Sequence, residues 1–299
     1  LADFKLKFSN RLYVDTRHPI NISYVYEIKD LYKADVVGAN FDDRSNALAT
    51  INNWLKMETA GKLSDSLTAA HINKGVSLLP VSHLYFEGKW PERFIEKKGF
   101  FKKEDGHKSV RTFFTGVRNT GYEENDYLQA QVLSLAFVRR GSLKIVMNIF
   151  LPHSSRGFGK MLEKLSKKPD SLWKCPLEQN VVNVTIPRFE LTKKATEFMW
   201  NPALLANETL LNYFFAPRRD LDLNKIFPGA VLAGIHTRAY ISVNGDGINT
   251  GPGTSVSESS GGSPNPVVPE VQFTADHPFA FSVLTEPTGD LLYVGTFKG

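Results

Sequence analysis

The amino-acid sequence predicts an α+β fold that forms a single domain over residues 1–299. The first observation behind this prediction is that long runs with strand character dominate, and the nearly unbroken apolar run 75–86 is the clearest of them. The second is that helical periodicity occurs between these runs, without the strict alternation of a parallel α/β sheet. The third is the composition, since 42% hydrophobic and 22% charged residues are typical of a globular chain with a large core.

Each element follows from a local pattern. Within residues 42–61, apolar side chains recur every three or four positions after a capping aspartate at 42 or 43, which predicts a helix. The run 75–86 predicts a strand covered on both faces, with Pro80 at a bulge or an edge. The other strands are expected at residues 3–14, 34–41, 143–151, 181–186, 230–243, 277–285 and 290–297, with further hairpin strands between 108 and 152, and the other helices at 20–33, 157–166 and 203–214.

One segment differs from the rest in composition. Residues 245–270 contain six Gly, four Pro and five Ser but no Lys or Arg. Such a composition cannot bury enough apolar surface to become ordered, so we expect an exposed loop over residues 245–265. A loop longer than about 15 residues inside a compact domain is either functional or a linker. Only about thirty residues follow it, too few for a second domain, so the loop belongs to this domain.

Several functional classes are disfavoured. The net charge of +5 is mild and scattered, and no apolar run approaches the ~20 residues of a membrane helix, so we expect neither a nucleic-acid partner nor a membrane partner. Paired lysines are more simply explained as solvated faces than as a glycosaminoglycan site. Neither a nucleophile elbow nor a zinc-protease or phosphate-loop motif is present, so the sequence does not predict an enzyme, a metal or a cofactor.

The compartment is indicated by two opposing signals. The single cysteine, Cys175, cannot form an intramolecular disulfide, which favours the cytosol. Three glycosylation sequons, at Asn21, Asn183 and Asn207, favour secretion instead. From the residues alone the compartment therefore stays open.

Six motifs then occur in a characteristic order along the chain. They are Ile51-Asn52-Asn53-Trp54 followed by Thr59 and Gly61-Lys62-Leu63; Leu84-Tyr85-Phe86-Glu87-Gly88-Lys89-Trp90; Ile186-Pro187-Arg188-Phe189; Ile235-His236-Thr237-Arg238-Ala239 followed by Val243-Asn244; Ala275-Asp276-His277-Pro278-Phe279; and Leu291-Leu292-Tyr293-Val294-Gly295. This set resembles the serpin family of serine protease inhibitors across nearly the whole chain. The resemblance implies three β-sheets with surrounding helices, and an exposed reactive loop that a protease cleaves. In the inhibitory mechanism, the cleaved loop inserts as an extra strand into a metastable central sheet and carries the acylated protease with it.

The loop departs from the pattern that the resemblance implies for its hinge. Inhibitory serpins have Glu-Glu-Gly-Thr-Glu and then small residues, whereas this hinge consists of Gly245, Asp246, Gly247, Ile248 and Asn249, followed by Pro252. The bulk of Ile248 would have to enter a packed core. Pro252 would remove a hydrogen-bond donor from a central strand. These residues favour a serpin-fold protein that no longer inhibits and acts as a binding or decoy protein; inhibition of a serine or cysteine protease is the alternative.

The bond that a protease would cleave is not fixed by the pattern. Counting from the hinge places it near Gly261, and counting back from the strand after the loop places it near Asn265. The candidates are therefore Gly261, Gly262, Ser263, Pro264 and Asn265, none of them a trypsin-like or chymotrypsin-like site. Val267 and Val268 would suit an elastase-like enzyme if they lie outside the following strand.

Three further residues receive roles from the resemblance. His236 matches the histidine of the serpin shutter, where hydrogen bonds hold the central strands together, and Ser82 stands where its usual Asn partner would be. Trp90 matches the tryptophan of the breach, at the end of the sheet where the loop begins to enter. The plainer roles are a histidine facing its neighbours on a strand and a tryptophan packed in the core.

The chain begins at a strand, and the helices that precede it in serpins are missing. We therefore expect exposed apolar sheet surface beside residues 75–86 and 231–243, which would cause self-association unless a longer protein covers it. The resemblance and the sequons together favour an extracellular, secreted glycoprotein whose partner is a protease.

Overall fold

The computed structural model describes most of the chain. The described residues are 4–64, 67–69, 72, 75, 77–139, 141–168, 178–191, 223, 226–230, 236–246, 269 and 271–299. The expected helix 203–214 lies outside them.

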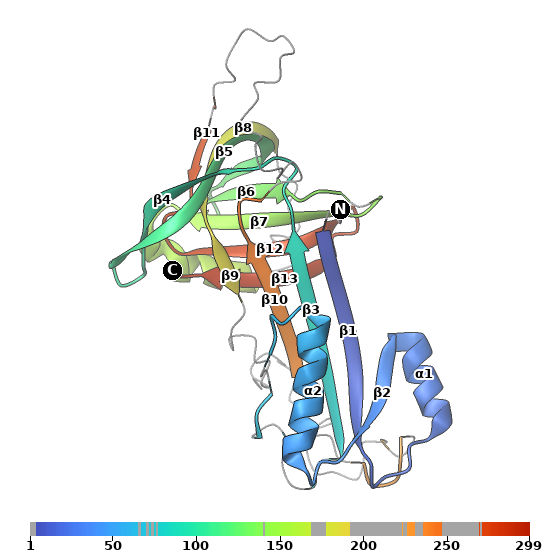
Figure 1. Cartoon of the computed structure of the whole chain (residues 1–299). Coiled ribbons are helices and arrows are strands. Elements are labelled where there is room, and N and C mark those ends of the chain that lie inside the picture. Colours follow the sequence, from blue (N-terminus) through green and yellow to red (C-terminus); the bar gives the residue numbers. More distant parts are fainter. Residues whose placement is uncertain are drawn as a thin grey trace, which may run out of the picture. The chain divides into compact units, whose positions relative to one another are not determined.

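The described residues form an α+β fold, as predicted (Figure 1). The strands are β1 (Phe4–Asp15), β2 (Ala34–Ala39), β3 (Leu78–Gly88), β4 (Ile95–Lys102), β5 (Lys108–Asn125), β6 (Ala130–Ala136), β7 (Lys144–Pro152), β8 (Glu178–Pro187), β9 (Phe189–Leu191), β10 (His236–Val243), β11 (Val271–Thr274), β12 (Phe279–Glu286) and β13 (Leu291–Phe297). The helices are α1 (Ile22–Tyr32), α2 (Arg44–Glu58) and α3 (Phe158–Lys167), with a short 3₁₀ helix, η2 (Ser155–Gly157), before α3.

The chain divides into two compact units. The eight-stranded unit comprises Leu1–Phe4, Glu87–Phe189 and Ser242–Gly299, and the five-stranded unit comprises Lys5–Phe86 and Glu190–Ile241. That both belong to one domain stays a prediction.

The five-stranded sheet has the strand order β2-β1-β3-β10-β9. β1 and β2 are parallel and joined through α1, because two parallel neighbours need a crossover connection. Helix α2 packs on one face of this sheet, where Ile51, Trp54 and Leu55 are buried in one cluster with Val81 of β3 and Tyr240 of β10. A single helix therefore covers both of the central strands β3 and β10 (Figure 1).

The motif residues of α2 have structural roles. The Asp43 side chain caps the helix by accepting a hydrogen bond from the Asn46 backbone N–H at 3.1 Å. The Thr59 hydroxyl ends it by donating to the Leu55 carbonyl at 2.6 Å. The Asn52 side chain exchanges two hydrogen bonds with the Leu67 backbone, at 3.0 and 2.9 Å. These contacts explain why Asn and Thr occur where they do around α2.

The eight-stranded sheet has the strand order β11-β8-β5-β6-β7-β12-β13, and β4 pairs with β5 beside this path. Two of the three expected sheets are joined in it. The reason is the length of β5, which pairs with β4 through residues 108–115 and with β6 through residues 121–125. Helix α3 covers part of one face, where its Phe158, Met161 and Leu165 are buried.

Candidate functional site

An aromatic cluster surrounds Trp90, two residues beyond β3. The Trp90 side chain is buried and stacks on Phe137, with ring centroids 4.3 Å apart and an interplanar angle of 16°. Phe94 meets the indole edge-on at 5.8 Å, and Phe114 lies 6.4 Å away. Four large rings thus form a rigid platform in the eight-stranded unit.

The first residues of the loop are fastened to this platform. The Trp90 indole Nε1–H donates to the Asn244 carbonyl at 2.6 Å, and the Trp90 backbone N–H donates to the Asp246 carbonyl at 3.0 Å. The Phe94 backbone N–H donates to the Gly245 carbonyl, also at 3.0 Å. Each carbonyl oxygen of residues 244–246 therefore has a hydrogen-bond partner on the platform.

Gly245 fits against the platform because it has no side chain. The residue is buried, whereas Asp246 is exposed as expected of the loop. A Cβ atom at position 245 would lie 3.1 Å from the Phe114 Cβ and 3.5 Å from the Phe94 Cβ. Any side chain at position 245 would therefore require the Phe114 Cβ to move by a few tenths of an ångström.

We expect Gly245→Ala to lower the free energy of unfolding by about 1–3 kcal/mol, because the added methyl group overpacks the platform. Urea denaturation measures this change. Gly159→Ala in α3 is the matched control, since a Cβ there meets no atom within 4 Å. The control should leave stability unchanged or raise it by up to about 1 kcal/mol. Equal effects of the two substitutions would contradict the close packing of Gly245.

Arg118 braces the platform from β5, a role that no local sequence pattern indicates. Its guanidinium lies 4.0 Å from the Phe94 ring centroid and donates to the carbonyls of Glu92 and Arg93 at 3.2 and 3.1 Å. Burial lowers the pKa of Arg118, and the nearby Glu92 carboxylate opposes this effect. The contact is a cation–π interaction that fixes the segment between Trp90 and Phe94.

The other end of the loop is held by β11. This strand pairs in parallel with β8, with Val271 opposite Val182. Both ends of the loop are therefore fixed in the eight-stranded unit. The predicted hinge residues Gly247, Ile248, Asn249 and Pro252, and the scissile candidates Gly261, Gly262, Ser263, Pro264 and Asn265, lie outside the described residues.

The two proposed shutter residues lie on neighbouring strands of the five-stranded sheet. Ser82 is in β3 and His236 is the first residue of β10, and both are half-buried. Because side chains alternate along a strand, Ser82 points away from α2, which packs on the face that carries Val81. Their role as a shutter stays a prediction.

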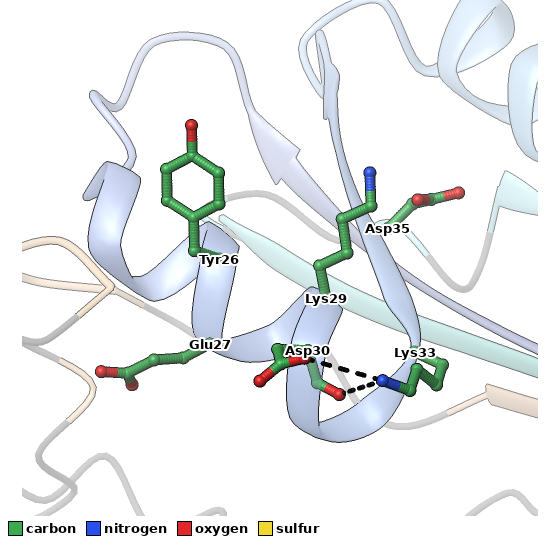
Figure 2. A pocket seen from close by; sticks show the side chains of 6 residues that line it. All are labelled: Tyr26, Glu27, Lys29, Asp30, Lys33 and Asp35. Atoms are coloured by element: carbon green, nitrogen blue, oxygen red, sulfur yellow. Dashed lines mark hydrogen bonds and ion pairs between the residues drawn. The ribbon is translucent and has the colours of Figure 1, made fainter.

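An open groove of about 800 Å³ lies between α1 and β2 (Figure 2). Its charged side chains face solvent, and Lys33 Nζ lies 3.7 Å from Asp30 Oδ1. Exposed ion pairs of this kind are weak and leave the ordinary reactivity of their groups unchanged, so the groove is not a candidate catalytic site. Among the described residues, no cluster of His, Cys, Asp and Glu could hold a metal ion. No helix in the described part of the chain is long and apolar enough to span a membrane.

Two of the three sequon asparagines lie among the described residues. Asn21 is exposed, and its Oδ1 caps α1 by accepting from the Ser23 backbone N–H at 3.0 Å. Asn183 lies within β8, half-buried, and its Nδ2 donates to Gln272 Oε1 at 3.0 Å. Asn207 lies outside the described residues.

The described residues form an α+β fold with two sheets, and the ends of a long loop are held at the Trp90 platform and at β11. Residues 1–298 match the family model described as Serpin (serine protease inhibitor), and the chain belongs to this family. The chain is 27% identical to human leukocyte elastase inhibitor, covering 99% of this chain and 78% of that protein. It is 26% identical to wheat Serpin-Z1C, in a match that covers 96% of this chain and 73% of that protein. The solved structure of Arabidopsis AtSerpin1 in its native stressed conformation superposes with a TM-score of 0.78 at 24% identity, covering 98% of this chain and 75% of that one.

The recognition of the family from six sequence motifs is thereby confirmed, and so is the fold class. The relatives carry the names of protease inhibitors, which supports the inhibitory alternative better than the non-inhibitory function that the hinge favours. Serpins in general inhibit proteases and are not catalysts.

Proposed function

We propose that this chain inhibits a serine or cysteine endopeptidase, with residues 245–265 as its reactive loop. The proposal depends chiefly on the match to the serpin family over residues 1–298. It is supported by the relative named leukocyte elastase inhibitor, and by a loop whose two ends are fixed at the Trp90 platform and at β11. The chain supplies no catalytic residue; the protease supplies the nucleophile.

The proposed reaction has two competing outcomes. The protease nucleophile attacks a carbonyl carbon in the loop, and an acyl bond to the enzyme replaces the peptide bond while the new amine leaves. Water then hydrolyses the acyl bond unless the freed loop segment first inserts between β3 and β10. These strands are neighbours in the five-stranded sheet, so an inserted strand would have a hydrogen-bonding partner on each side. Inhibition therefore requires insertion to be faster than hydrolysis.

A panel of proteases tests the proposal. We expect at least one elastase-like enzyme to form a complex that survives SDS, because Val267 and Val268 are the apolar residues of small size near the scissile candidates. Trypsin, chymotrypsin and a papain-like enzyme complete the panel. Cleavage of the loop by every enzyme without any SDS-stable complex would make the protein a substrate and would overturn the proposal.

A second candidate is a binding or decoy protein that is cleaved but does not trap its protease. Ile248 and Pro252 favour it, because bulk and a missing N–H both oppose insertion. The melting midpoint after loop cleavage separates the two functions. Insertion should raise the midpoint strongly, whereas a loop that stays outside the sheet should change it by a few degrees at most.

We also propose that the protein is secreted and glycosylated. The expected site is Asn21 rather than Asn183, because Asn21 is exposed and its cap uses Oδ1, whereas Nδ2 of Asn183 is engaged on a strand. After expression through a secretory pathway, an endoglycosidase should increase the gel mobility of the protein. In an Asn207→Asp background, Asn21→Asp keeps the helix cap and should abolish that shift, and Asn183→Asp should not. A shift that survives Asn21→Asp would contradict the site.

A further inference from the structure

His83 is a buried histidine beneath α2 that the proposed reaction does not use. It lies in β3 with no exposed surface, and its ring centroid is 5.3 Å from that of Trp54 in α2. Neither ring nitrogen has a hydrogen-bond partner among the described residues. The nearest charged atom is Glu58 Oε2, 3.6 Å from Nε2, which is within ion-pair distance but too far for a good hydrogen bond.

The Glu58 carboxylate joins α2 to β1. Glu58 is the last residue of α2, and its Oε2 lies 2.7 Å from Lys7 Nζ and accepts a hydrogen bond from the Ser9 hydroxyl at 3.1 Å, both on β1. Burial of Glu58 raises its pKa, but the bonds from Lys7 and Ser9 outweigh this, so that the net shift is downward. The carboxylate is therefore ionised at neutral pH and already shared by two donors of β1.

Four other charged groups near α2 form two pairs. On the side of β10, Lys62 lies 3.4 Å from Glu190, which also accepts from the Tyr240 hydroxyl at 3.0 Å. On the side of β2, Arg11 stacks over the Trp54 ring at 4.7 Å and its Nε lies 3.7 Å from Asp35. The ordinary pKa values of Lys, Arg, Tyr, Asp and Glu lie outside pH 5–7, so His83 is the described group of this neighbourhood whose ordinary pKa lies in that range.

We propose that His83 makes the packing of α2 on the five-stranded sheet sensitive to pH, so that mild acid loosens α2 and eases the parting of β3 and β10. The second half of this proposal rests on the proposed function. A neutral imidazole fits beside Trp54, but an imidazolium ion in the same fully buried position loses its hydration and must compete with Lys7 and Ser9 for the Glu58 carboxylate.

Burial and the charge of Glu58 together determine whether acid favours the packed or the open state of α2. Burial lowers the pKa of His83 below its ordinary 6.5, and the attraction of Glu58 only partly offsets this. The closed state with α2 packed down therefore takes up a proton at lower pH than a state in which His83 is hydrated. Well above pH 6.5 the two states bind protons equally. As the pH falls through 6.5, each step toward acid favours the open state until the lowered pKa is reached.

Hydrogen exchange of the α2 backbone tests the proposal. After correction for the chemical exchange rate, we expect protection of residues 51–58 to fall by up to about tenfold between pH 7.5 and 5.5, because an open-state histidine of ordinary pKa is about ten-elevenths protonated at pH 5.5. His83→Gln cannot take up a proton and should show equal protection at both pH values. The matched control is His153→Gln, since His153 lies 3.7 Å from Glu124 but is 46% exposed.

A second variant keeps the test decisive if His83→Gln folds poorly. Glu58→Gln removes the charge that attracts the imidazolium ion, so the pKa of His83 in the closed state should fall further. The loss of protection should then begin at the same pH as in the wild-type protein and continue to lower pH. Wild-type protein without a pH response at α2, or a response that His83→Gln retains, would overturn the proposal. A loss of protection that ends at a higher pH in Glu58→Gln than in the wild-type protein would do the same.

Uptake of a synthetic peptide copying residues 247–260 tests the link to insertion without any protease. We expect the wild-type protein to incorporate the peptide faster at pH 5.5 than at pH 7.5, and His83→Gln to incorporate it at equal rates. Faster uptake at acid pH in both proteins would separate insertion from His83 and overturn the second half of the proposal. A protein that takes up no peptide at either pH counts against loop insertion itself, and the exchange result still decides whether His83 loosens α2.

Discussion

Trp90→Ala should lower the free energy of unfolding by about 3–5 kcal/mol and detach the base of the loop. The substitution removes a buried indole, leaves a cavity among Phe94, Phe114 and Phe137, and deprives the Asn244 carbonyl of its donor at 2.6 Å. Urea denaturation measures the loss of stability. Amide exchange at residue 94 reports on the loop base, because the Phe94 N–H donates to the Gly245 carbonyl.

Trp90→Phe is the matched control for this prediction. A phenyl ring keeps much of the stacking on Phe137 but cannot donate to Asn244, so the expected loss is about 1–2 kcal/mol, with protection at residue 94 retained. An alanine variant as stable as the phenylalanine variant would contradict the role of the ring platform. Loss of stability with unchanged protection at residue 94 would show that the loop base does not depend on Trp90.

The helix α2 could be predicted closely from the sequence because its signals are local. The cap at Asp43 and the apolar recurrence lie within a few residues of the helix they define. β4 could not be predicted in this way. Its sequence is rich in lysine, and seven of its eight residues are exposed or half-buried, so the alternation typical of a strand is absent. Its partner in β5 determines that it is a strand.

The candidate site could be predicted only in part. The motif around Trp90 indicated where the loop begins, but the burial of Gly245 depends on Phe114, 131 positions earlier in the chain. The role of Arg118 likewise depends on contacts with carbonyls about 25 residues away. Long-range contacts of this kind leave no pattern in the local sequence. Sequence patterns depend on residues that recur at regular spacing, and a single glycine or a single arginine does not recur.

The double substitution Ile248→Thr with Pro252→Ala should raise the ratio of SDS-stable complex to cleaved product by about fivefold to a hundredfold. In an inserted strand, Pro252 leaves one buried carbonyl of a neighbouring strand without a donor, which costs about 1–3 kcal/mol. Alanine restores the N–H, and threonine replaces the bulk of Ile248 with a smaller side chain suited to a strand. Densitometry of the two products after reaction with a common elastase-like enzyme measures the ratio.

Pro269→Ala provides the matched control, since Pro269 follows every scissile candidate as well as Val267 and Val268 and would not enter the sheet. It should leave the ratio unchanged. The melting midpoint of the cleaved protein supplies an independent measurement, because a more completely inserted strand adds stability that a loop outside the sheet cannot add. If the double variant forms more complex and its cleaved form melts higher than the cleaved wild-type protein, the hinge residues limit insertion in this serpin. If the ratio does not change although complex forms, insertion ends before residue 252 and the hinge is not the limiting segment.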